Sequence, residues 1–132
     1  MQRVYPMEEL SPTISLVIDH YGYSEDFFKL RSLWKTLSSD PRIKLNLNHH
    51  NSYIEALCRC KAFNQAVSVF LDDFLRKKIK PSLRTLLSII TPLRAANKKL
   101  LETNLLEFVE KTWPDVHNEF YKHDFAENKP KK

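Results

Sequence analysis

The large apolar residues of this chain recur at helical spacing in several separate stretches. The clearest case is the stretch 24–39, where they follow the i, i+3, i+4 rule typical of one buried helix face. The members of this stripe are Phe27, Leu30, Leu33, Trp34 and Leu37. Together with stop signals, the same pattern predicts six helices, at 11–22, 24–39, 51–60, 64–77, 82–95 and 98–112.

Cap and breaker residues suggest where these helices begin and end. Ser11 is the expected N-cap of the first helix, with Pro12 at its first helical position and Gly22 closing it. Ser24 is expected to cap the next helix, followed by two acidic residues in its first turn. Pro114 is expected to end the last helix of the series, and one further short helix is expected from about residue 117.

The apolar pattern also repeats along the chain at an interval of 36 residues. Five sets of large residues fall in register at this interval, beginning with the set Ile18, Ile54 and Ile90. A fixed period in this range is typical of stacked helix pairs. We therefore predict an all-α fold, a short right-handed α-solenoid of about three antiparallel helix-turn-helix repeats.

The repeat predicts the division of the chain. A lead-in of residues 1–10 would precede a repeat domain of residues 11–113, with units of about 11–46, 47–82 and 83–113. Residues 114–132 would form a C-terminal extension with a basic tail.

Composition supports this fold class and excludes several kinds of catalytic and phosphate-binding motif. Of 132 residues, 42% are hydrophobic and 28% charged, which suits one folded domain. Only one glycine is present, so left-handed turns should be nearly unavailable and glycine-rich phosphate loops and nucleophile elbows are excluded. We expect no enzyme, no cofactor and no small-molecule substrate. The formal net charge of +5 gives only a mild attraction to polyanions.

The cysteines and histidines do not indicate a metal site. Cys58 and Cys60 point about 200° apart on a helix, so a mutual disulfide is not expected, and Cys58 is predicted to be a core residue in a reducing compartment. The adjacent His49 and His50 lack a partner pair with zinc-binding spacing. No apolar stretch is long enough to span a membrane, and the first ten residues do not resemble a targeting segment.

The central unit resembles the pentatricopeptide repeat. The resemblance rests on "HNSYIEALCRCKAFNQAVSVFLDDFLRKKIKPS", which matches that family's opening, its second-helix pattern and its closing Ile-Lys-Pro. It covers roughly residues 11–113, is strongest at 47–82 and weakens outward. It implies a divergent organellar member, located in the mitochondrial matrix, whose targeting segment is absent from this chain.

The resemblance implies binding of single-stranded RNA, with each repeat reading about one base through two or three side chains. Carried over by position, the base readers would be Asn51 with Ser82 in the second unit and Ser15 with Asn46 in the first. The family also implies a role in translation, processing or stability of transcripts. Partners could then include the mitochondrial ribosome or other RNA-processing proteins.

Other interpretations of these residues remain open at this point. Ser82 could be only an N-cap, Asn51 could cap its own helix, and Ser15 could be an ordinary exposed residue. A group of basic residues could contact phosphates or could simply be solvated at helix ends. This group comprises Lys77, Lys78, Lys80 and Arg84. The competing function is a protein-binding helical scaffold within a larger assembly, which would need neither base readers nor a basic groove.

Overall fold

The computed structural model describes residues 7–76 and 78–127, and all regular secondary structure in these two ranges is helical. The seven helices are α1 Met7–Tyr23, α2 Phe27–Ser39, α3 Leu47–Arg59, α4 Phe63–Arg76, α5 Leu83–Ala95, α6 Lys99–Thr112 and α7 Pro114–Glu127. The all-α prediction is confirmed. Across the same ranges, no helix combines the length and the apolar character that crossing a membrane requires.

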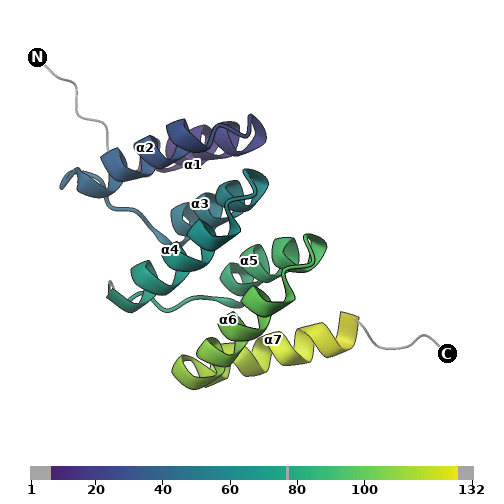
Figure 1. Ribbon diagram of the computed structural model, residues 1–132. Helices are drawn as coiled ribbons and strands as arrows, with labels where there is room; N and C mark the ends of the chain where they lie inside the picture. The colour runs from purple at the N-terminus through teal and green to yellow at the C-terminus, as the bar shows by residue number, and fades with distance from the viewer. Residues whose placement is uncertain (1–6, 77, 128–132) are drawn as a thin grey trace, which may run out of the picture. The chain divides into compact units, whose positions relative to one another are not determined.

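The chain divides into two compact units, Met1–Ala66 and Val67–Lys132. In the first unit α1 contacts both α2 and α3, and α2 also contacts α3 (Figure 1). In the second unit α5 contacts both α6 and α7, and α6 also contacts α7 (Figure 1). The boundary falls within α4, so each unit contains part of that helix.

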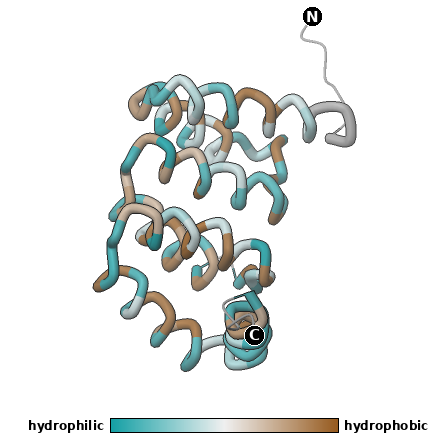
Figure 2. The backbone as a smooth tube through the Cα atoms, turned by 90° about the vertical axis from the view of Figure 1, so that its right-hand side faces the viewer, coloured by the Kyte–Doolittle hydropathy of each residue, from teal (hydrophilic) through white to brown (hydrophobic). Residues whose placement is uncertain are grey.

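Apolar residues at the repeated positions are buried. Ile18 and Ile54 have no exposed surface, and Ile90 is 1% exposed. Along the helices, hydrophobic and hydrophilic positions alternate, as amphipathic packing requires (Figure 2). Trp34 and Phe70 are also buried, whereas Phe108, another apolar residue of the same kind, is half-buried. Trp34 stacks on Tyr53 with ring centroids 4.2 Å apart.

The turn that follows α1 is held by two specific backbone hydrogen bonds. The Glu25 N–H donates to the Gly22 carbonyl oxygen over 3.1 Å, and the Asp26 N–H donates to the Tyr21 carbonyl oxygen over 3.0 Å. Glu25 has a left-handed backbone, with φ 55°. This combination is the Schellman motif, which satisfies the last carbonyls of a helix.

The same motif follows α3 and α5. The N–H groups of Lys61 and Ala62 each donate over 2.9 Å to carbonyls three and five residues earlier, and those of Asn97 and Lys98 do so over 3.0 and 2.8 Å. The left-handed residues are Lys61 and Asn97, with φ 61° and 62°. Together with Glu25 they lie 36 residues apart, so the predicted interval recurs in the backbone geometry of the turns.

These turns correct the expectation drawn from the scarcity of glycine. In the described residues positive φ occurs only at non-glycine positions, which are Glu25, Lys61, Lys78 and Asn97. A left-handed backbone costs an L-residue about 1–2 kcal/mol. Each Schellman turn offsets that cost with two hydrogen bonds, which contribute about 0.5–1.5 kcal/mol each. Left-handed turns are therefore available to this chain without glycine.

The single glycine serves close helix packing. Gly22 lies inside α1, and a Cβ placed on it would come within 2.8 Å of the Ala56 Cβ and 2.9 Å of the Ala56 Cα on α3. Real Cβ atoms do not approach other carbons that closely, so α1 and α3 can contact at this depth only with glycine here. The expectation that Gly22 closes the helix is wrong, because α1 continues to Tyr23.

Several predicted helix starts are also wrong. α1 begins at Met7, before the predicted boundary of the lead-in, and Pro12 lies inside the helix. α2 is capped by Asp26, whose carboxylate accepts the Lys29 N–H over 3.2 Å, and Ser24 belongs to the preceding turn. Ser24 cannot cap α2 because it lies within the Schellman turn of residues 21–26. The side chain of Asp26, the last residue of that turn, is the first that can cap the next helix.

The C-terminal extension is more regular than predicted. Pro114 begins α7, a helix of 14 residues that packs on α5 and α6. Proline is favoured at a first helical position, because its missing N–H would have no partner there. Val116 and Phe120 are the buried residues of α7. The tail beyond Glu127 lies outside the described residues.

We expect Gly22→Ala to destabilise the protein by about 1–3 kcal/mol, because the added methyl group overpacks the contact between α1 and α3. The free energy of unfolding can be measured by urea denaturation followed by circular dichroism. Adding Ala56→Gly should recover part of the loss in a double-mutant cycle. A gain in stability, which helix propensity alone would give Gly22→Ala, would contradict the close contact.

We expect Lys61→Gly to stabilise the protein by about 0.5–1 kcal/mol, because glycine adopts the left-handed backbone without steric cost and loses only part of that gain to chain entropy. The matched control is Lys61→Ala, which removes the same side chain but keeps the strain and should give no gain. Equal unfolding midpoints for the two variants would contradict this account of the turn.

Candidate RNA-binding residues

The base-reading candidates of the first unit lie at different places on two helices, one in the middle of α1 and one at the N-terminus of α3. Ser15 is a half-buried residue of α1, and Asn46 is the exposed N-cap of α3. The Asn46 Oδ1 accepts the His49 N–H over 2.9 Å, and the Asn46 N–H donates to the His49 Nδ1 over 3.0 Å. This is a capping box in which histidine takes the place of glutamate. Within the described residues the Asn46 side chain bonds to His49 and Ser11 and not to Ser15.

His49 also ties α3 to α1. Because its Nδ1 accepts a hydrogen bond, its proton lies on Nε2, and that atom is 3.1 Å from the Ser11 carbonyl oxygen and 2.9 Å from the Ser11 Oγ. His49 has no exposed surface. Ser11, predicted to be a helix cap, instead anchors the buried imidazole. Sequence reasoning missed this role of His49. The available signal was its position three residues after the N-cap Asn46, the same position that Thr85 has relative to Ser82.

Asn51, the first candidate reader of the second unit, is a buried residue of α3. Its side chain is 2% exposed, and its Oδ1 accepts no hydrogen bond from the described residues. The alternative that Asn51 caps its own helix is wrong, because Asn46 is the cap. A base edge can reach Asn51 only if this burial is relieved. Base reading by Asn51 therefore stays a prediction with that structural condition.

Ser82, its proposed partner, is half-buried and is the N-cap of α5. The Ser82 Oγ accepts the Thr85 N–H over 3.2 Å, and the Ser82 N–H donates to the Thr85 Oγ1 over 3.1 Å. The capping boxes at Asn46 and Ser82 lie 36 residues apart, like the Schellman turns. Both proposed readers at the ends of repeats therefore have a structural role, and whether they also read bases stays a prediction.

The basic residues beside Ser82 differ in whether they form ion pairs. Lys78 and Arg84 are exposed and form no ion pair with another described residue. Lys80 donates to Asp115 at the start of α7, and this hydrogen bond holds the pKa of Asp115 below its usual value. Lys77 lies outside the described residues. In this segment Lys78 and Arg84 are thus the cations most available to an anion.

A cluster of charges that the sequence did not reveal joins three helices of the second unit. The Arg94 Nε donates to Glu102 over 2.9 Å, and its two terminal nitrogens donate to Asp124 over 2.5 and 3.0 Å. The two hydrogen bonds to Asp124, with the one to Glu102, raise the pKa of Arg94. The guanidinium also lies over the Phe120 ring, 5.6 Å from its centroid.

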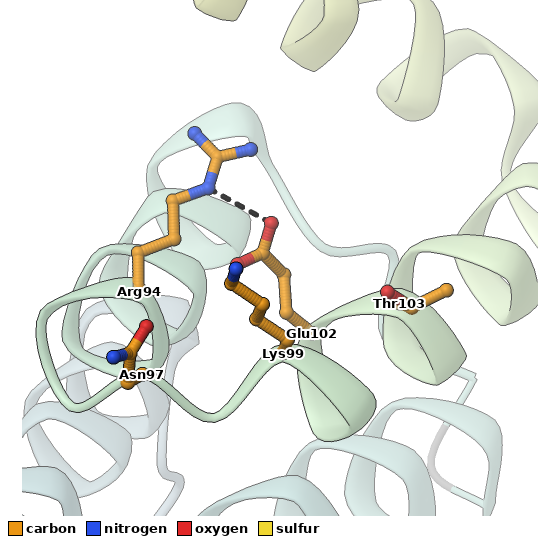
Figure 3. A pocket seen from close by; sticks show the side chains of 5 residues that line it. All are labelled: Arg94, Asn97, Lys99, Glu102 and Thr103. Carbon is orange, nitrogen blue, oxygen red and sulfur yellow. Dashed lines mark hydrogen bonds and ion pairs between the residues drawn. The ribbon is translucent and has the colours of Figure 1, made fainter.

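A hollow of about 430 Å³ lies beside this cluster (Figure 3). It is lined by Arg94, Asn97, Lys99, Glu102 and Thr103. Because the strongest cation there is already bound to two carboxylates, the arrangement stabilises the packing of α5, α6 and α7 and does not form an anion site. The sequence spacing of Arg94, Glu102 and Asp124 carries no local signal of this contact.

The two cysteines are free thiols in different surroundings. Cys58 is 5% exposed, and burial raises its pKa to about 12. Cys60 is half-buried, and burial, followed by the charges of Glu25 and Asp26, raises its pKa to a lesser extent. The burial of Cys58 confirms the prediction that it is a core residue. In the described ranges, no three His, Cys, Asp or Glu side chains gather closely enough to hold a metal ion.

Comparison with known proteins adds no identification. No family model, curated protein or solved structure matches this chain. The resemblance to the pentatricopeptide repeat therefore rests on the residues of this sequence alone.

We expect Cys60 to be alkylated by iodoacetamide faster than Cys58 in the native protein. At pH 8 a thiol with a pKa of about 12 has roughly one part in ten thousand as the reactive thiolate. Because its pKa is raised, Cys58 should gain reactivity only as the pH approaches that value. Site-resolved mass spectrometry measures both rates, and urea-unfolded protein, in which the rates should converge, is the control. Equal rates in the native protein would contradict the burial of Cys58.

Proposed function

We propose that this chain is a non-catalytic module that binds single-stranded RNA. The observation that carries the proposal is the pair of exposed cations Lys78 and Arg84, which lie four residues before and two residues after Ser82, the N-cap of α5. Unpaired cations beside a helix N-terminus favour phosphate groups, because the helix dipole adds to the cations' charge. The formal net charge of +5 acts in the same direction.

The proposed architecture is a short right-handed solenoid of pentatricopeptide-like helix pairs. It is supported by the Schellman turns at Glu25, Lys61 and Asn97, and by the capping boxes at Asn46 and Ser82, which recur at the interval of the sequence repeat. Units that repeat in this way bury their apolar faces by stacking on one another. The resemblance to the pentatricopeptide repeat extends the proposal to mitochondrial gene expression, in the translation, processing or stability of transcripts.

Energetics favour a larger assembly over an isolated reader. One well-read base contributes about 1–3 kcal/mol of discrimination, so two readers contribute roughly 2–6 kcal/mol. Immobilising one molecule on another costs about 4–15 kcal/mol. We therefore propose that tight selection of a transcript needs further repeats or a protein partner, such as the mitochondrial ribosome or another RNA-processing protein.

A protein-binding scaffold is the second candidate, and one observation favours it. Tyr121 and Phe125, one helical turn apart on α7, are 65% and 63% exposed. Exposed aromatic residues at this spacing are typical of a helix face that docks on a protein partner. A hydrophobic protein interface would depend weakly on salt, whereas RNA binding depends on it strongly.

We expect the protein to bind a single-stranded RNA oligonucleotide with an affinity that falls steeply between about 50 mM and 200 mM salt. Arg84→Ala should weaken binding and reduce the slope of log affinity against log salt by about 0.7, the value for one phosphate contact on a single strand. Fluorescence anisotropy of a labelled oligonucleotide measures both quantities.

The matched control is Arg31→Ala, which removes the same charge from an exposed position of α2 in the first unit. It should change affinity only slightly, through the net charge. If the two variants lose affinity equally, or if RNA does not bind even at about 50 mM salt, the RNA proposal is wrong. Salt-independent capture of a protein ligand would then support the scaffold.

A further inference from the structure

We propose that a second hollow of this protein binds one nucleotide of the RNA, with the base against Trp113 and the phosphate on Lys78. This inference rests on the proposed function and names a contact that the base readers do not provide. The hollow has a volume of about 280 Å³ and lies wholly within the second unit. Its lining includes Phe74, Lys78, Ile79, Lys80, Thr112 and Trp113.

The floor of the hollow is aromatic and apolar. Phe74 is 1% exposed, and Ile79 and Trp113 are half-buried. Trp113 meets Phe70 and Phe108 edge to face, with ring centroids 6.1 and 5.9 Å apart and ring planes at 89° and 70°. These contacts leave Trp113 only half-buried, and part of it lines the hollow. A nucleobase packing against that part of the indole would make the aromatic contact that single-strand binders favour.

The rim of the hollow is basic, but its two lysines are not equivalent. Lys80 is engaged by Asp115, which partly neutralises it. Lys78 is exposed, forms no ion pair with a described residue, has a left-handed backbone with φ 54°, and lies two residues after the end of α4. Lys78 is therefore the phosphate ligand, and Asp115 competes with phosphate for Lys80.

The size of the hollow selects among occupants. Pockets for drug-sized ligands and cofactors begin at about 300 Å³, so about 280 Å³ suits a single base with its sugar and not a dinucleotide. An apolar floor with a cationic rim matches an aromatic base carrying a phosphodiester. Three lining residues of the hollow, 78–80, lie within four residues of the candidate reader Ser82. One RNA strand can therefore contact both the hollow and Ser82.

The test uses the full chain with uridine 5′-monophosphate, adenosine 5′-monophosphate and a single-stranded RNA oligonucleotide as probes. The chain has two tryptophans, and their indole N–H signals in nitrogen-15 spectra can be assigned with Trp113→Phe. We expect the Trp113 signal to shift on titration and the signal of Trp34, which is 8% exposed, to stay in place.

Two pairs of variants test the rim without disturbing the core. Lys78→Gly removes the ammonium group at a left-handed position that glycine prefers, and Lys61→Gly makes the same change at a matching φ in the first unit. Only Lys78→Gly should lower RNA affinity, with a salt slope smaller by about 0.7. Asp115→Asn should raise affinity by releasing Lys80, whereas Asp72→Asn, at an exposed site of α4, should change it less.

Loss of the stacked base should weaken RNA binding by about 5- to 150-fold in Trp113→Leu, provided its circular dichroism matches that of the parent. RNA binding with an unmoved Trp113 signal and equal effects of Lys78→Gly and Lys61→Gly would overturn this site and leave the proposed function standing. Absence of RNA binding would remove both. A Trp113 shift caused by a phosphotyrosine peptide and by no nucleotide would overturn the RNA assignment in favour of a protein ligand.

Discussion

The two hydrogen bonds of the Schellman turn are the constraint on which the helix pairs depend. In each of the three turns, a residue with positive φ and the residue after it donate to carbonyls near the end of the preceding helix. This ends one helix and sets the position at which the next can begin. In the first turn Asp26 has two roles: its N–H completes the Schellman motif, and its side chain caps α2. The turn and the next helix therefore share this residue.

Much of the fold could be predicted from the sequence, because burial follows periodicity. The in-register residues Ile18, Ile54 and Ile90 are all buried, and most of the predicted helices exist. Helix starts were harder to predict. Capping preferences suggested Ser11 and Ser24 as helix starts. The actual helix starts depend on backbone geometry at residues such as Glu25, and glutamate is not a residue type from which a left-handed conformation is predicted. Gly22 was assigned to a turn because its packing against Ala56 is a contact distant in sequence.

The candidate site was less accessible to sequence reasoning. Position within the repeat placed Asn46 and Ser82 at the ends of successive units, and the structure shows that both are N-caps with capping boxes. For Asn46 this helix start was not predicted, because the helix was expected to begin only at residue 51. Position within the repeat could not reveal that Asn51 is buried, because burial depends on tertiary packing and not on the residue type. The hollow beside Trp113 and the cluster around Arg94 were missed for the same reason: each assembles side chains from several helices.

The turns rest on main-chain atoms, so their central position tolerates glutamate, lysine and asparagine alike. Substitutions at the left-handed position of each Schellman turn can therefore change its charge without disrupting the helix pair that the turn joins. Each turn is thus a position at which electrostatic character can diversify while the helix pair persists. A family built this way would keep its architecture long after its loop signatures had become unrecognisable.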